Sequence, residues 1–84
     1  MSKKEKLINR LKSRPRDFTI NELDTLMSHM GFWKRNAGKT SGSRIEYTND
    51  GKKFIKLHRP HPGNEYKPYQ LDDIIDDLKG RGLL

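Results

Sequence analysis

Apolar residues recur at helical spacing near both ends of this chain and alternate with polar residues in the middle. Near the start, Leu7, Ile8 and Leu11 form a narrow apolar stripe on an otherwise basic segment. The stripe predicts a helix over residues 2–13, which Pro15 ends. Because the stripe is thin, we expect this segment to be either a loosely docked helix or a frayed basic arm.

A second helix is predicted to begin at Thr19. Thr19 and Glu22 have the spacing of a capping box, in which the side chain of each bonds the backbone amide of the other. Phe18 and Leu23 occupy the positions of a hydrophobic staple around this cap, and Gly31 is suited to end the helix. The apolar residues at helical spacing within it are Ile20, Leu23, Leu26, Met27 and Met30.

Three extended runs follow, over residues 32–35, 43–48 and 53–58, where apolar and polar residues alternate. The sequence NDG at residues 49–51 is typical of a hairpin turn and joins the second run to the third. We therefore expect an antiparallel meander of three strands.

A closing helix is predicted over about residues 69–81, where Leu71, Ile74, Ile75 and Leu78 repeat every three or four positions. The order of elements is then α-α-β-β-β-α, which predicts an α+β fold with a three-stranded antiparallel sheet. Helices with apolar faces can cover one face of this sheet, and the other face is left for a ligand or partner.

Charge divides the chain into four blocks with a formal net charge of +7. Residues 1–16 hold seven Lys/Arg against one Glu, and residues 31–67 hold nine against three acids. Residues 17–30 and 68–84 are mildly acidic. The basic blocks can serve solubility alone, but we favour a polyanion partner, most simply nucleic acid.

The chain contains no cysteine, so we expect neither a disulfide framework nor thiolate chemistry. This composition fits a reducing cytoplasm. The first residues lack a long apolar run, and we expect no signal peptide and no membrane span.

Two of the three histidines, His58 and His61, lie in the proline-rich stretch LHRPHPGN at residues 57–64. RNA cleavage without a metal needs a base for the 2′-hydroxyl and an acid for the leaving 5′-oxygen, and imidazole suits both roles. Pro60 and Pro62 restrict the backbone around the histidines. A zinc site is disfavoured because structural zinc takes four ligands and these two histidines have no cysteine to join them. A rigid, solvated turn without function is the remaining alternative.

Several cations are candidates for contacts with RNA phosphates. They are Lys34, Arg35, Lys39, Arg44, Lys52, Lys53, Lys56, Arg59 and Lys67. Trp33 and Tyr47 could stack on bases, as aromatic residues on an open sheet do in RNA-binding modules. Packing in the core is the alternative for both rings.

Three stretches resemble the HicA family, small toxins of bacterial toxin–antitoxin pairs. The first is TINELDTLMSHMGF at residues 19–32, and the second is GSRIEY at residues 42–47, similar to the family's Gly-Ser-His-x-x-aromatic. The third is Pro60-His61, followed by Lys67-Pro68 and the closing helix. The resemblance covers about residues 19–84. Residues 1–17 are expected to form a basic helical extension to a HicA-like domain over residues 18–84.

The resemblance implies a fold like that of a double-stranded-RNA-binding domain. It also implies ribosome-independent cleavage of mRNA without a cofactor, and neutralisation by a HicB-type antitoxin. This chain departs from the family at Arg44, where the motif usually has a histidine. Arginine stays protonated but can clamp a phosphate, so the expected proton-transfer residues are His61 and His58. A non-catalytic RNA-binding module on the same fold and a protein-interaction domain are the alternatives.

Overall fold

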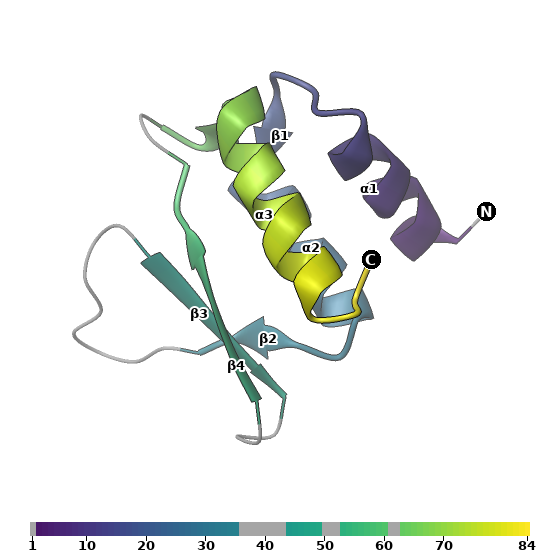
Figure 1. The fold of residues 1–84 in the computed structure, drawn as a ribbon, viewed down its shortest axis with the longest axis vertical. Coiled ribbons are helices and arrows are strands. Elements are labelled where there is room, and N and C mark those ends of the chain that lie inside the picture. Colours follow the sequence, from purple (N-terminus) through teal and green to yellow (C-terminus); the bar gives the residue numbers. More distant parts are fainter. Residues whose placement is uncertain (1, 36–43, 50–52, 61–62) are drawn as a thin grey trace.

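The computed structural model describes residues 2–35, 44–49, 53–60 and 63–84. Over these residues the chain forms an α+β fold in which three helices lie together on one side of a three-stranded antiparallel sheet (Figure 1). The helices are α1 (Lys3–Lys12), α2 (Ile20–His29) and α3 (Pro68–Gly80). The strands are β1 (Phe18–Thr19), β2 (Trp33–Lys34), β3 (Arg44–Asn49), β4 (Lys53–His58) and β5 (Glu65–Tyr66). The predicted fold class and the order of the main elements are confirmed.

Helix α2 begins at the predicted cap. The Glu22 amide donates to the Thr19 hydroxyl and the Thr19 amide donates to the Glu22 carboxylate, both at 3.2 Å. Phe18 and Leu23, the predicted staple residues, are both fully buried. The helix is followed by Gly31 in the left-handed region, with φ of 88°. Local chemistry therefore sets both ends of this helix.

Helix α1 packs into the hydrophobic core against α2 and α3 and is not a frayed arm. Leu11 is fully buried, and Leu7 and Ile8 pack partly buried beside it. The Arg10 guanidinium donates to the carboxylates of Asp17 and Glu22. A further ion pair of 2.9 Å joins Arg14 to Asp72 of α3. The predicted helix is present, and it is held by buried apolar surface and by ion pairs to its neighbours.

The three-stranded sheet has the order β2-β3-β4, and all its pairs are antiparallel. Its helix-side face carries Ile45, Tyr47, Ile55 and Leu57, which are buried. The remaining fully buried residues come mainly from the helices: Leu11, Phe18, Leu23, Leu26, Met27, Tyr66, Leu71 and Leu78. The predicted NDG turn includes Asp50 and Gly51, which lie outside the described residues.

A second, two-stranded sheet was not predicted. Phe18 of β1 pairs with Tyr66 of β5, and Thr19 pairs with Glu65. Both Phe18 and Tyr66 are fully buried, so this small sheet joins the entrance of α2 to the segment before α3. None of the helices in the described part of the chain is long and apolar enough to cross a membrane.

Candidate nucleic-acid interface

The sheet face opposite the helices is lined by alternate residues of the three strands. Along β4, Phe54, Lys56 and His58 are exposed, whereas Ile55 and Leu57 between them are buried. Cross-strand partners in an antiparallel pair project from the same face, so the register identifies the other residues of this surface. We call it the open face and define it by Trp33, Arg35, Arg44, Glu46, Thr48, Phe54, Lys56 and His58.

The open face carries excess positive charge. Arg35, Arg44 and Lys56 are all exposed cations, and Arg59 follows directly after β4. The acid in the described part of this face, Glu46, forms an ion pair of 3.2 Å with Arg35. The other cations are therefore left to attract a polyanion from solvent.

His58 and Arg44 lie at the same end of the open face. They are directly opposite each other in the β3–β4 register, and both are exposed. The Arg59 Nε–H donates to the backbone oxygen of Arg44 at 3.4 Å, which directs its guanidinium toward this end of the sheet. The charge of Arg59 also acts on the hydroxyls of Tyr47 and Tyr66, which face the helices. Arg44 is therefore the guanidinium residue that shares the open face with His58 at this end.

The backbone at His58 is held by a residue from the second sheet. The hydroxyl of Tyr66 donates to the backbone oxygen of His58 at 2.6 Å. Burial raises the pKa of Tyr66 well above its usual range, so this hydroxyl keeps its proton at neutral pH. Tyr66 thus fixes the end of β4 from the helix side and leaves the imidazole side exposed.

Two predicted contact residues face the helices. Tyr47 is fully buried, and its hydroxyl donates to Asp24 of α2, while burial and this carboxylate raise its pKa. Lys34 forms an ion pair of 3.1 Å with the same Asp24. The ring of Tyr47 is a core residue, which was the alternative reading of its role, and it is not available for stacking on a base.

Other predicted residues lie apart from this surface or outside the described residues. Lys67 directly precedes α3, and its backbone amide donates to the side-chain oxygen of Gln70. It follows β5 in the chain and is not part of the three-stranded sheet. Lys53 is exposed at the start of β4, at the end of the strand opposite to His58. His61, Lys39 and Lys52 lie outside the described residues.

Phe54 is a feature of the open face that was not singled out from the sequence. Its side chain and that of Trp33 are 43% and 48% exposed, although both are large apolar residues. The guanidinium of Arg35 lies over the Phe54 ring, 5.2 Å from its centre. The sequence could have identified Phe54 through the alternation of apolar and polar residues in β4. Because Ile55 and Leu57 point inward, the alternation requires Phe54 to point outward.

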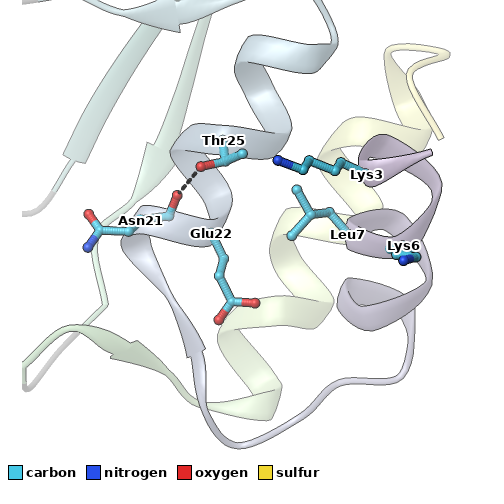
Figure 2. Close-up of a pocket in the computed structure, with 6 residues that line it drawn as sticks. All are labelled: Lys3, Lys6, Leu7, Asn21, Glu22 and Thr25. Atoms are coloured by element: carbon cyan, nitrogen blue, oxygen red, sulfur yellow. Dashed lines mark hydrogen bonds between the residues drawn. The ribbon is translucent and has the colours of Figure 1, made fainter.

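The structure also has a shallow hollow of about 350 Å³ between α1 and α2, shown in Figure 2. It is lined by Lys3, Lys6, Leu7, Asn21, Glu22 and Thr25. The hydrogen bond to Arg10 lowers the pKa of Glu22, which therefore stays ionised and is not suited to donate a proton. The Thr25 hydroxyl donates to the backbone oxygen of Asn21 (Figure 2). The residues that line this hollow include no histidine, so it offers no group comparable with His58 of the open face.

Within the described ranges, no group of three or more His, Cys, Asp or Glu side chains is placed to hold a metal ion. The groups that face solvent at the candidate site are an imidazole and cations. They suit the binding of phosphates and proton transfer.

One family model matches the chain, over residues 20–79, and its description is HicA toxin of bacterial toxin–antitoxin. The match begins at the first residue of α2 and ends within α3, so it includes the whole open face and leaves α1 outside. Comparison with curated proteins and with solved structures found no match.

Proposed function

This chain belongs to the HicA family of toxins from bacterial toxin–antitoxin pairs, and we propose that it acts as an endoribonuclease that cuts mRNA without a metal. The observation that carries the proposal is the placement of His58 directly opposite Arg44 at one exposed end of a basic sheet face. An imidazole and a guanidinium in this arrangement can meet the same phosphodiester. Cleavage of mRNA is a cytoplasmic activity, which agrees with a chain that lacks cysteine.

The proposed reaction uses the 2′-hydroxyl of the RNA as its nucleophile. An imidazole nitrogen takes the hydroxyl proton, the 2′-oxygen attacks the adjacent phosphorus, and the bond to the 5′-oxygen breaks as an acid protonates it. We assign His58 and His61 to the two proton transfers. His58 is supported by its exposure at the site, and His61 by its place directly after Pro60 in the third stretch that resembles the family.

Arg44 takes an electrostatic part in this proposal. A guanidinium does not lose its proton at neutral pH, so it cannot replace the family's histidine as a base. It can donate two parallel hydrogen bonds to a phosphate and stabilise the charge that develops on the phosphoryl oxygens. Lys56 adds positive charge on the same face, and Arg59 adds positive charge at the edge next to His58.

The antitoxin of the pair is proposed to be a HicB-type protein that covers the open face. Support comes from the family and from the exposure of the residues concerned, His58 and Arg44, on the open face. A protein that covers this face would exclude RNA from both the cations and the imidazole.

A second candidate function is RNA binding without cleavage. The observation that favours it is the guanidinium of Arg44 at the position where the family motif has an imidazole. The two functions share the open face and differ in whether His58 and His61 move protons.

Incubation of the purified protein with RNA in EDTA separates these candidates. We expect the unmodified protein to cut RNA, and His58→Ala and His61→Ala each to lose most of that activity while keeping RNA binding. A substrate with a 2′-deoxy sugar at the cleaved bond should stay intact. Cleavage that survives both substitutions would refute the assigned chemistry, and binding without cleavage by the unmodified protein would favour the second candidate.

A further inference from the structure

We propose that Trp33 and Phe54 form a subsite that stacks on unpaired bases of RNA. The inference rests on the proposed function for its RNA partner, and on the geometry of the open face for its position. In the register, Thr48 of the central strand β3 is the partner of both Trp33 and Phe54. The two aromatic residues therefore flank it from the outer strands. Neighbouring strands are about 4.8 Å apart, so the backbones that carry the rings lie roughly 10 Å from each other.

The exposure of these rings is not explained by the fold. Ile45, Tyr47, Ile55 and Leu57 provide the core of the sheet on its helix side. Within the described residues, the other large apolar side chain with comparable exposure is Tyr69 of α3, which lies away from the open face. Two neighbouring aromatic residues on the solvent side of a sheet are the usual stacking platform of single-strand RNA modules.

Arg35 completes this platform. Its guanidinium lies 5.2 Å from the centre of the Phe54 ring, and its ion pair with Glu46 holds it there. A guanidinium plane beside an aromatic ring offers a further surface on which a base can stack. The pair also neutralises Glu46, so the acid does not repel the phosphates that accompany a bound base.

The chemistry favours a single strand over a duplex. In a duplex, the flat faces of the bases are stacked on one another and are not open to a protein ring. Double-stranded RNA is therefore bound through its backbone and minor groove. Exposed aromatic residues would gain little from such a ligand. Arg44 and Lys56 on the same face supply the charge that attracts the phosphates of a single strand.

The register also gives the distance from this subsite to the proposed site of cleavage. Phe54 and His58 are four residues apart on β4, which corresponds to roughly 13 Å along an extended strand. A stacked nucleic-acid strand advances about 3.4 Å for each nucleotide, so the stacked base lies at most about four nucleotides from the bond next to His58. The subsite would then help to set where on the RNA the cut falls.

The single tryptophan of the chain allows a direct test, because its fluorescence reports on Trp33 alone when it is excited selectively. The protein carrying His58→Ala is titrated with an eight-nucleotide single-stranded RNA and with the same strand in a duplex. We expect the single strand to quench Trp33 and the duplex to leave its emission nearly unchanged. Equal quenching by both ligands, or no quenching at saturation with the single strand, would overturn the subsite.

Substitutions at Phe54 test the second ring, with Tyr69→Ala as a matched exposed-aromatic control. Phe54→Ala and Phe54→Leu should both weaken single-strand binding by roughly 5- to 150-fold, since stacking on one base contributes about 1–3 kcal/mol. Phe54→Leu keeps an apolar side chain on the strand, and urea unfolding of both variants separates a loss of stacking from a loss of the fold. Unchanged RNA affinity in both variants, with binding of the antitoxin lost, would mean that the rings form a protein contact and would overturn the proposal.

The outcomes for this subsite and for the nuclease can be separated. Quenching by a single strand, without any cleavage by the unmodified protein, would keep the subsite and reject the nuclease. Cleavage that depends on His58, without quenching of Trp33, would reject the subsite and keep the nuclease.

Discussion

Arg44 and His58 are directly opposite each other on the neighbouring strands β3 and β4, at one end of the open face. The Cβ atoms of such a pair lie about 4.5–5.5 Å apart, so a guanidinium and an imidazole can reach the same phosphate from two strands. Tyr66 holds the backbone of His58 from the other side.

The cations of the open face should contribute to RNA binding through phosphate contacts. For single strands, each such contact adds about 0.7 to the slope of log affinity against log salt concentration. Arg44→Ala and Lys56→Ala should each reduce the slope by about this amount, as measured by RNA titration at several salt concentrations. Lys4→Ala on α1 is the control, because Lys4 is exposed on a helix packed away from the open face. An equal effect of all three substitutions would show that only net charge matters.

Tyr66→Phe should slow cleavage by loosening the strand end that carries His58. The substitution removes the hydroxyl that donates to the His58 backbone oxygen but keeps the buried ring. A loss of stability of about 1 kcal/mol is expected from one such bond, measured by urea unfolding. RNA affinity should stay close to that of the unmodified protein. A variant that cuts RNA at the original rate would show that this bond does not position His58.

Leu11→Ala should strongly destabilise the whole protein. Leu11 of α1 is fully buried in the shared core, and replacement of a buried leucine by alanine costs roughly 2–5 kcal/mol. Lys12→Ala, at the adjacent exposed position, should change stability little. Both free energies are measured by urea unfolding. Similar values for the two variants would mean that α1 is dispensable for the fold.

The ion pair between Arg10 and Glu22 should make a contribution to stability that depends on pH. Arg10 lowers the pKa of Glu22 below its ordinary value of 4.5 in the folded protein. A group whose folded pKa is depressed stabilises the fold above its unfolded pKa, and this contribution is lost as pH falls through the folded pKa. Glu22→Gln should therefore reduce stability at pH 7, and the difference should shrink below about pH 4.5. A difference between the two proteins that stays constant down to pH 3 would contradict this assignment.

Sequence patterns predicted the elements that are set by local chemistry. The capping box at Thr19 and Glu22 marks the start of α2, and the alternation around Ile55 and Leu57 identifies β4. The same alternation implied that Phe54 faces solvent, although the sequence alone did not show that Arg35 would lie over its ring.

The features that were missed depend on contacts between distant parts of the chain. Strands β1 and β5 have only two residues each, which is too short for an alternation of apolar and polar residues to be recognised. Their pairing joins Phe18 to Tyr66, which are far apart in the sequence. The hydrogen bond from Tyr66 to His58 depends on that pairing. The thin apolar stripe of α1 was compatible with either a docked helix or a frayed arm. Residues of α2 and α3 bury Leu11, so the helix is docked.

We propose that His58, together with His61, performs the proton transfer that the family motif assigns to a histidine at the position of Arg44. The most direct measurement is the rate of RNA cleavage in EDTA by the unmodified protein, by His58→Ala, and by a protein carrying both Arg44→His and His58→Ala. Because the two positions face each other, an imidazole at residue 44 can reach the same phosphate. We predict that His58→Ala loses cleavage and that the double variant regains part of it. Cleavage by His58→Ala at the rate of the unmodified protein would contradict the claim.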